Sequence, residues 1–419
     1  MSKVLVIGLG YVGLPLAMRA VEVGHDVVGY DTDTDRVKRL ATGDSYIEDI
    51  ASSGLEQALA SGKLRVSDDP KACGGFDVAV ITVPTPLREG NPDLSYVESA
   101  GVTLARYLRP GATVVLESTT YPGTTEELLG PILEERSGLA VGDDFHLGYS
   151  PERIDPGNVE WPFARTPKVV SGVDEASCLA VQAFYDTLVA RTVPVRSVKV
   201  AELSKLLENT FRHVNIALVN ELAMFAHELD IDIWEAVDAA ATKPFGFMPF
   251  RPGPGVGGHC LPIDPSYLSW RVRRALGANF RFDELANDIN DHMPDYVTQR
   301  LVVGLNRESK ALRGSRVLLL GLAYKANSGD VRESPSAAIA EQLLALGAEV
   351  CGADPLVVEH HLDGRVHRVE ATAEELRAAD AVVLLTDHAQ FDYDLVAAES
   401  RYVLDCRRRL PATPNVEHL

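Results

Sequence analysis

One cysteine stands at the end of a glycine-rich run, in a pattern that predicts a reactive thiol. The segment 250–265 reads FRPGPGVGGHCLPIDP, so Cys260 follows the glycines and Asp264 comes four residues later. Glycine lets a backbone approach a ligand closely, and Pro262 and Pro265 are expected to prevent a helix directly after the cysteine. A free cysteine is most often a small buried hydrophobe, but the glycines, the preceding His259 and the acid favour chemistry here. We therefore expect Cys260 on a fixed turn that faces a ligand.

A lysine and an asparagine share one face of a long predicted helix. The segment from Val198 to about Thr242 contains no proline or glycine, and its apolar residues recur every three or four positions. Lys205 and Asn209 are four residues apart, so they lie about one turn apart on the same face. From the pattern alone, such a lysine is more often a solvated surface residue than a functional one. A helix of this length between two domains is also well placed to carry a dimer interface.

The first forty residues contain a dinucleotide-binding fingerprint in its required setting. A buried strand over Lys3 to Ile7 runs into Gly8-Leu-Gly10-Tyr-Val-Gly13, and a helix is expected from Leu14 to Val23. The glycines permit the tight turn, the approach of a pyrophosphate and close helix–strand packing. A second strand from His25 to Tyr30 ends in Asp31, which is placed to accept from a ribose 2′-hydroxyl and to repel a 2′-phosphate. This arrangement predicts NAD rather than NADP.

The remaining strands predict an α/β chain with two doubly wound parallel sheets. In the first half we expect strands at 78–82, 113–117 and 146–149, followed by the turns VPTP, STTYPGTT and SPERIDPG, and ligands collect at such carboxyl ends. A second Rossmann-like unit is expected to start at 316–320, with further strands at 350–353, 381–386 and 402–405. It has GLA where the first unit has GLG, so we expect no second dinucleotide. The last nine residues, PATPNVEHL, are expected to form a loose tail.

Composition excludes several classes of protein. The 419 residues carry 40 Lys and Arg against 60 Asp and Glu, a net charge of −20 that argues against a nucleic-acid binder. Five widely spaced cysteines fit neither a disulfide framework nor a zinc site, so we expect four packing cysteines, one chemical cysteine and no metal. Without a signal sequence or a long apolar run, the chain is expected to be cytoplasmic and not bound to a membrane.

Taken together, the motifs resemble the nucleotide-sugar 6-dehydrogenases over nearly the whole chain. The resemblance is carried by GLGYVGLPLA, VPTP, ESTTYPGTTEE, SPERIDPGN, AELSKLLENTFRHVNIALVNELA, PGPGVGGHCLPIDP, and GLAYK with RESP. Members of that family use NAD to oxidise the C6 hydroxyl of a UDP-hexose to a carboxylate. The resemblance implies an NAD-binding Rossmann domain over 1–197, a central helical dimerisation and catalytic domain over 198–305, and a UDP-sugar-binding Rossmann-like domain over 306–419. It also implies a UDP-sugar substrate and a homodimer.

The resemblance further implies a role for individual residues. The catalytic set is Cys260 as nucleophile, Lys205 and Asn209 at the oxyanion, Asp264 beside the hydrolytic water, and Thr119 with Glu152 for proton transfer. The cofactor-binding set is Gly8, Gly10, Tyr11, Val12, Gly13, Asp31, Arg36, Thr85 and Thr119. The substrate-binding set is Glu152, Arg153, Lys205, Asn209, Arg251, Gly257, Lys325 and Arg332. The segment ANSGDVRESP departs from the family by Gly329, where relatives usually carry a second Asp, which bears on C-terminal closure and not on the chemistry.

The chemistry explains why a thiol is needed. A first oxidation gives an aldehyde, Cys260 adds to it, a second oxidation gives a thioester, and water releases the uronate. Within the family, His259 and the segments PERIDPGN and LPIDP favour the 2-acetamido branch, UDP-N-acetylglucosamine or UDP-N-acetylmannosamine. UDP-glucose is the alternative substrate. A two-electron alcohol dehydrogenase has no use for Cys260, and an inactive nucleotide-sugar-binding protein would not be expected to keep the Cys, Lys, Asn and Asp set.

Overall fold

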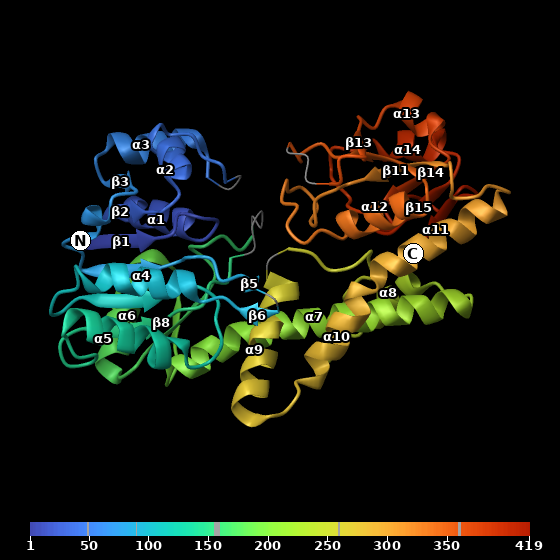
Figure 1. The fold of residues 1–419 in the computed structure, drawn as a ribbon. Coiled ribbons are helices and arrows are strands. Elements are labelled where there is room, and N and C mark those ends of the chain that lie inside the picture. Colours follow the sequence, from blue (N-terminus) through green and yellow to red (C-terminus); the bar gives the residue numbers. More distant parts are fainter. Residues whose placement is uncertain (48–49, 89, 155–159, 259, 359–361) are drawn as a thin grey trace. The chain divides into compact units, whose positions relative to one another are not determined.

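A computed structural model of the chain folds as two compact units, each discontinuous in sequence (Figure 1). The structure describes residues 1–47, 50–88, 90–154, 160–258, 260–358 and 362–419, and for Cys260 and Pro262 it describes the backbone alone. The N-terminal unit combines Met1–Glu208 with Ser266–Ala278, and the C-terminal unit combines Asn209–Pro265 with Asn279–Leu419. The division into three domains that the sequence predicts remains a prediction, which this division into two units does not test.

The N-terminal unit is built on an eight-stranded sheet in the order β10-β9-β8-β7-β4-β1-β2-β3. All neighbouring strands are parallel except β8 and β9, which are antiparallel. The strands predicted in this half are therefore confirmed, with ends that match the prediction or differ by one residue. The strands are β1 (Lys3–Ile7), β2 (Asp26–Tyr30), β3 (Leu64–Ser67), β4 (Val78–Ile81), β7 (Thr113–Leu116), β8 (His146–Tyr149), β9 (Lys168–Gly172) and β10 (Thr192–Pro194).

Helices connect these strands, and their apolar faces complete the core of the unit. Leu14, Leu16 and Ala17 of α1 pack with Val4 and Val6 of β1 in one buried cluster. A short hairpin, β5 (Leu87–Arg88) with β6 (Asn91–Pro92), follows β4. The helical segments are α1 (Gly13–Glu22), α2 (Thr34–Ala41), α3 (Ser52–Ala60), η1 (Pro70–Cys73), α4 (Ser95–Ala105), η2 (Thr125–Leu129), α5 (Gly130–Ser137) and α6 (Glu175–Leu188).

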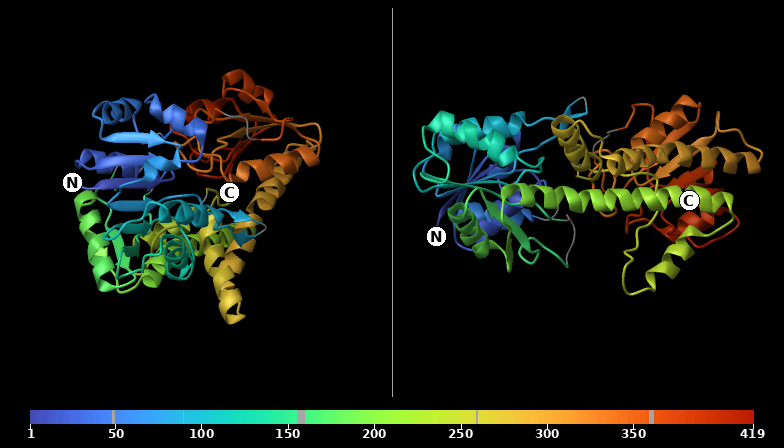
Figure 2. Two further views of the ribbon diagram at one scale, coloured as in Figure 1. Left: turned by 60° about the vertical axis from the view of Figure 1, so that its left-hand side comes forward. Right: turned by 90° about the horizontal axis from the view of Figure 1, so that it is seen from below.

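The long helical pattern after residue 197 forms two helices, so the expected single helix was wrong in its second half. The first, α7 (Val198–Glu228), runs unbroken for 31 residues, as the view from below in Figure 2 shows. It ends because Asp230 adopts a left-handed conformation (φ 55°), and Asp232 then caps α8 (Ile233–Ala241) by accepting from the amides of Trp234 and Glu235. Aspartate tolerates a left-handed conformation and also caps helices, so apolar residues can keep their helical spacing across a break in the helix.

The segment after the glycine-rich run is helical, which corrects the expectation that its prolines prevent a helix. Cys260 is the first residue of α9 (Cys260–Leu276), and Pro262 lies in the first turn, where a backbone N–H has no partner within the helix. Pro265 lies inside the helix. Cys260 thus begins a helix rather than occupying a turn. The chain continues with α10 (Arg281–Asp291) and α11 (Met293–Arg307), and within the described residues no helix is long and apolar enough to cross a membrane.

The C-terminal unit has a six-stranded sheet in the order β13-β12-β11-β14-β15-β16, parallel throughout. Its predicted second Rossmann-like character is confirmed. Helices α11 and α12 share a buried core with this sheet, including Val297, Leu301 and Ile339. The elements are β11 (Arg316–Leu320), α12 (Pro335–Ala345), β12 (Glu349–Ala353), β13 (His367–Arg368), α13 (Ala373–Ala378), β14 (Ala381–Leu384), α14 (Tyr393–Glu399), β15 (Val403–Asp405) and β16 (Val416–His418).

The last residues are part of the sheet, so the expectation of a loose tail was wrong. Val416–His418 pairs with β15 as the edge strand β16. Glu417 accepts hydrogen bonds from Arg300 at 2.5 Å and from Tyr402 at 2.9 Å, and the indole of Trp234 donates to the carbonyl of Leu419. The prolines and polar residues of this segment suggested a tail, but strand pairing, an ion pair with α11 and a hydrogen bond from α8 hold it.

Candidate active site

The loop between β1 and α1 has the shape of a dinucleotide cradle. Gly8 has a left-handed φ of 90°, and a Cβ on Gly13 would lie 1.9 Å from the carbonyl oxygen of Gly8. A Cβ on Gly10 would meet no protein atom within 4 Å, so the space beside this backbone is open on the protein side. Val12 immediately precedes α1, whose N-terminus favours phosphate oxygens. This loop fits the pyrophosphate of NAD.

Asp31 lies directly after β2 and is anchored on both carboxylate oxygens. One oxygen accepts from the Leu9 amide at 2.8 Å and from the Arg36 guanidinium at 2.9 Å, and the other accepts from the Asp33 amide at 2.9 Å. The Asp31 side chain is buried, whereas Arg36 remains 35% exposed. A ribose hydroxyl can therefore reach this carboxylate by displacing one exposed side chain.

The other predicted cofactor residues occupy loops at the carboxyl ends of the strands. Thr85 follows β4, is buried, and accepts from the Tyr267 hydroxyl at 2.7 Å through its carbonyl oxygen. Thr119 follows β7 and is half-buried, and Tyr11 is half-buried in the glycine loop. These positions agree with the rule that ligands of parallel sheets bind at that edge.

Glu152 is buried beyond the end of β8, where two residues that the sequence did not single out contact it. The ammonium of Lys168, the first residue of β9, lies 3.2 Å from the Glu152 carboxylate and also bonds to Glu117 after β7. Burial alone would raise the pKa of Glu152, but the Lys168 charge and the contact with Glu117 hold it below its usual value. The available signal was a lysine that opens an otherwise uncharged strand.

Arg153 and Glu202 make contacts that shape the loops around Glu152 and Thr119. Arg153 pairs with Glu208 at 2.8 Å and donates to the carbonyl of Pro167 at 2.7 Å. Glu202 of α7, also missed from the sequence, accepts from the amides of Gly123 at 2.6 Å and Thr125 at 2.9 Å. Glu202 therefore ties the loop that follows β7 to the helix that carries Lys205.

Two predicted catalytic residues of the C-terminal unit are in direct contact. The Asn209 amide donates to an Asp264 carboxylate oxygen at 2.5 Å, and both side chains are 1% exposed. Arg212 donates to the other side of the Asn209 amide at 2.6 Å. Lys205, one turn before Asn209 on α7, is buried, unlike the solvated surface lysine that the helical pattern alone favours. Cys260 lies one turn before Asp264 at the start of α9, and its side chain, like all of His259, lies outside the described residues.

The glycine-rich run needs its glycines for contact with the protein itself. A Cβ on Gly257 would lie 2.6 Å from Tyr324, and one on Gly258, whose φ is 84°, would lie 2.7 Å from the same tyrosine ring. The Gly258 amide donates to the carbonyl of Arg332, and the Gly253 amide donates to the side chain of Asn220. The run therefore packs on the loop after β11, which carries Lys325 and Arg332.

The remaining residues predicted to bind substrate take no part in the contact between Asn209 and Asp264, and two of them form local ion pairs. Arg251 is exposed and pairs with Asp238 of α8. Arg332 is about half exposed and pairs with Asp330 at 2.6 Å, and Lys325 is half-buried in the same loop. The loop thus carries two cations, and their predicted contact with the nucleotide end of the substrate stays a prediction. Across the described residues, no group of three or more His, Cys, Asp or Glu side chains is arranged to hold a metal ion.

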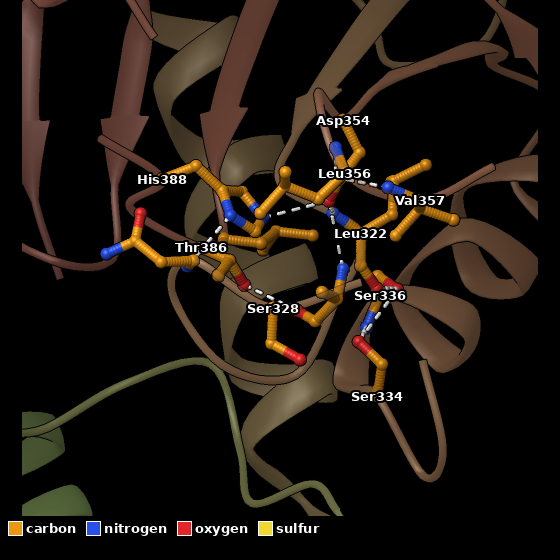
Figure 3. A network of polar contacts seen from close by, with 12 residues as sticks. Leu322, Ser328, Ser334, Ser336, Asp354, Leu356, Val357, Thr386 and His388 are labelled. Atoms are coloured by element: carbon orange, nitrogen blue, oxygen red, sulfur yellow. Dashed lines mark hydrogen bonds and ion pairs between the residues drawn. The ribbon is translucent and has the colours of Figure 1, made fainter. Parts of the chain in front are cut away.

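A second strand-end aspartate, Asp354, organises the loops of the C-terminal unit (Figure 3). One carboxylate oxygen accepts from the amides of Leu322 and Ala323 and from His388, at 2.6, 3.1 and 3.0 Å. The other accepts from the amides of Leu356 and Val357 at 2.8 and 2.9 Å. Burial alone would raise the pKa of Asp354, but these donors hold it well below its usual range.

The fold and the N-terminal cradle define an NAD-binding Rossmann protein, and comparison with known proteins defines its family. Three models of the UDP-glucose/GDP-mannose dehydrogenase family match: the NAD binding domain at residues 2–189, the central domain at 199–292 and the UDP binding domain at 318–412. The chain therefore belongs to this family and is an NAD-dependent UDP-sugar dehydrogenase.

Individual relatives extend over almost the whole chain. UDP-N-acetyl-D-glucosamine 6-dehydrogenase of Pseudomonas aeruginosa is 38% identical over 93% of this chain and 91% of its own. UDP-N-acetyl-D-mannosamine dehydrogenase of Pyrococcus horikoshii is 36% identical over 93% of this chain and 90% of its own. A solved structure of the UDP-D-ManNAc dehydrogenase from Pyrococcus horikoshii superposes with a TM-score of 0.90 at 33% identity, covering 99% of this chain and 98% of that one.

Proposed function

We propose that this enzyme oxidises the C6 hydroxyl of a UDP-N-acetylhexosamine, UDP-N-acetylglucosamine or UDP-N-acetylmannosamine, to the uronate. The observation that carries the proposal is the hydrogen bond between Asn209 and Asp264, with Cys260 one turn earlier on α9. It joins residues from two motifs that are far apart in sequence and that the four-electron chemistry requires together. The names of the relatives from Pseudomonas aeruginosa and Pyrococcus horikoshii support the 2-acetamido sugar.

In the proposed reaction, Cys260 is the nucleophile. When bound, NAD accepts a hydride from C6 in each of the two oxidations. The Cys260 thiolate adds to the C6 aldehyde and forms a thiohemiacetal, whose oxidation gives a thioester. Water then attacks the thioester carbon, the C–S bond breaks, and the carboxylate leaves. The position of Cys260 at the N-terminus of a 17-residue helix favours the thiolate.

The other residues support charge and proton transfer. Lys205 and Asn209 stabilise the oxygen that becomes negative when sulfur or water adds, an effect that is often worth several kcal/mol in dry sites. Asp264 orients the hydrolytic water and is held by the Asn209 amide. Thr119 and Glu152 complete the proton transfer, and the nucleotide end of the substrate lies on Lys325 and Arg332. Arg153, Arg251 and Gly257 belong to the proposed substrate contacts.

The test is a substrate panel combined with a matched pair of cysteine variants. Wild type should release two NADH for each uronate from the preferred UDP-N-acetylhexosamine, with no free aldehyde. Cys260→Ala should lose turnover by several orders of magnitude and still bind NAD. Cys178→Ala, which changes a half-buried cysteine of α6, is the control and should stay fully active. Near-normal uronate formation by Cys260→Ala would refute the covalent mechanism, and a preference for UDP-glucose would refute the sugar assignment.

A homodimer is the proposed assembly. Helix α7 leaves large apolar side chains exposed along its length, including Leu218, Leu222 and Phe225, and α10 exposes Phe282 and Leu285. Several large apolar side chains exposed on neighbouring turns of a helix are typical of an interface between subunits. The mass in solution should be at least twice 45.4 kDa. A fully active monomer at micromolar concentration would contradict the proposal.

A further inference from the structure

The reversal of strand direction between β8 and β9 gathers charged residues at one edge of the sheet. Glu117 directly follows β7, and Glu152 lies three residues beyond β8. Because β9 is antiparallel to β8, its first residue, Lys168, lies at the same edge as the ends of β7 and β8. A parallel β9 would have placed this lysine at the opposite edge.

The three charged groups form one buried cluster. The Lys168 ammonium contacts a carboxylate oxygen of Glu117 and lies 3.2 Å from Glu152. The hydroxyl of Tyr185, from α6, donates to the second oxygen of Glu117. Glu117 and Tyr185 are 0% exposed, Lys168 3% and Glu152 8%. The cluster is therefore shielded from bulk water.

Two carboxylates face a single ammonium in this cluster, so the charges do not balance when both acids are ionised. An uncompensated charge away from water is costly, and among these three contacting groups that cost favours retention of one proton. Burial raises the pKa of Glu117 to about 8, whereas Lys168 keeps that of Glu152 low. The other groups that act on the cluster are Lys205 from α7 and the rings of Tyr185 and Phe163, which flank the Lys168 ammonium.

We propose that Lys168 and Glu117 are positioning residues that keep Glu152 ionised: Lys168 supplies the charge, and Glu117 holds the proton that the cluster retains. The cluster is then neutral, and Glu152 is its one member ready to accept a proton. This inference rests on the proton-transfer role proposed above for Glu152. A purely structural ion cluster would not require the proton to lie on one particular acid, whereas this proposal places it on Glu117.

The first test needs no substrate. In the NAD-free protein at neutral pH, infrared difference spectra should contain the carbonyl stretch of a protonated carboxylic acid that Glu117→Gln removes. The band should disappear in wild type as the pH is raised through about 8. Tyr185→Phe, which removes the hydroxyl donor of Glu117 but neither carboxyl group, should keep the band with a shifted frequency. If Glu117→Gln leaves the protonated-acid bands of the protein unchanged at neutral pH, the proposal is wrong.

The second test is the pH dependence of turnover with the preferred sugar nucleotide. Lys168→Met should lower kcat and move its acid limb to higher pH, because Glu152 then ionises less readily, while KM for NAD is unchanged. Lys168→Arg should restore the acid limb. The matched control is Lys199→Met, which removes an exposed lysine of α7 that pairs with Glu127, and its limb should stay in place.

The outcomes separate this inference from the function on which it rests. A uniform loss of kcat in Lys168→Met without movement of the acid limb would show that the lysine is only structural. If Lys168→Met does not fold, Lys168→Arg and the infrared band of Glu117 still decide the proposal. If wild type forms no NADH with any sugar nucleotide, the proposed function fails, whereas the infrared test still decides where the proton resides.

Discussion

Asp31 and Asp354 occupy the same position in the two Rossmann-like units but perform different tasks. Each directly follows the second strand of its unit. In each unit a glycine with left-handed φ, Gly8 or Gly321, follows the first strand. Each accepts from the amide of the residue after that glycine, at 2.8 Å in one unit and 2.6 Å in the other. The backbone geometry of the two turns is thus closely similar.

The difference between the two aspartates lies in the hydrogen-bond donors that contact each carboxylate. Among the described residues Asp31 has three donors, one of them the exposed side chain of Arg36, whereas Asp354 has five, including the fully buried His388. Because His388 accepts the Asn327 amide on Nδ1, its ring proton lies on Nε2, toward Asp354. A ligand can displace Arg36 from the Asp31 carboxylate. Both carboxylate oxygens of Asp354 already accept from its five donors, so they have no room for a further hydrogen bond. The same acid is therefore accessible to a ligand in one unit and committed to loop structure in the other.

The distance from strand to helix reinforces this difference. In the N-terminal unit α1 begins at Gly13, close behind β1, so its N-terminus faces the glycine turn. In the C-terminal unit, residues 321–334 separate β11 from α12, and this loop carries Lys325 and Arg332. The first unit therefore presents backbone amides at the start of its helix, whereas the second presents side-chain cations in a long loop.

The largest expected effect is on stability. Asp354→Ala should leave four backbone amides and one imidazole without their acceptor, at a cost of about 4 kcal/mol in the free energy of unfolding. Asp31→Ala should cost about 2 kcal/mol, because it strands fewer donors and one of them reaches solvent. Hydrogen exchange of the peptides around 322–323 and 356–357 measures the first effect. Equal losses of protection in the two variants would remove the distinction between the two acids.

A second expected effect is that Glu202 in the N-terminal unit and Asp354 in the C-terminal unit make local stability depend on pH with opposite sign. Burial raises the pKa of Glu202 in the N-terminal unit to about 7, so its folded pKa exceeds the unfolded value. Its contribution is complete below about pH 4 and is lost as the pH rises to about 7, which amounts to roughly 3 kcal/mol. The depressed pKa of Asp354 contributes stability above about pH 4 that is lost as the pH falls.

Hydrogen exchange at several pH values, corrected for intrinsic rates, can follow the segments 118–129 and 321–334 separately. Glu202→Gln should flatten the slope of the first segment and leave the second unchanged. If both segments gain protection as the pH rises from 4 to 8, the raised pKa assigned to Glu202 is wrong.

A smaller effect concerns cofactor choice. Wild type should prefer NAD over NADP by at least about tenfold, because a 2′-phosphate would meet the Asp31 carboxylate. Asp31→Asn should bring the two cofactors close to parity, since it removes the repulsion and frees Arg36 to bind the phosphate. The control is Asp33→Asn, which keeps Asp31 and should keep the preference. Steady-state kcat/KM with each cofactor gives the result, and equal use of both cofactors by wild type would contradict the assignment.

The smallest expected effect tests whether a glycine alone makes a dinucleotide site. Ala323→Gly turns GLA into GLG in the C-terminal unit, yet Asp354 remains fully occupied and α12 still begins far from the strand. Calorimetric titration should therefore find one NAD per chain in the variant, as in wild type. A second binding event would show that the alanine, and not the hydrogen bonding of Asp354, excludes the dinucleotide.

Local patterns predicted most of the fold. Buried parallel strands are continuous apolar runs, so β1, β8 and β11 were predicted with their observed ends. The helix break at Asp230, the helix that begins at Cys260 and the edge strand at Val416 were not predicted. Each depends on a cap, a proline position or a pairing partner that the apolar period does not record.

The candidate site was predicted where a motif fixes it and missed where the contacts are non-local. Asn209 and Asp264 were both singled out from their motifs, although the hydrogen bond between them was not predicted. Lys168, Glu117 and Glu202 were missed because their importance depends on the antiparallel turn of β9 and on a loop that meets α7. A lone charged residue in an apolar strand is a weak signal until its neighbours are known.

The discontinuous N-terminal unit has a consequence for synthesis on the ribosome. Ser266–Ala278 belongs to this unit, and the hydroxyl of Tyr267 donates to the carbonyl of Thr85 across 182 residues of sequence. Non-local contacts of this span form late, because the intervening chain must first be made and closed into a loop. The N-terminal sheet can therefore assemble early on the nascent chain, but its loop at Thr85 stays incomplete until α9 has left the exit tunnel.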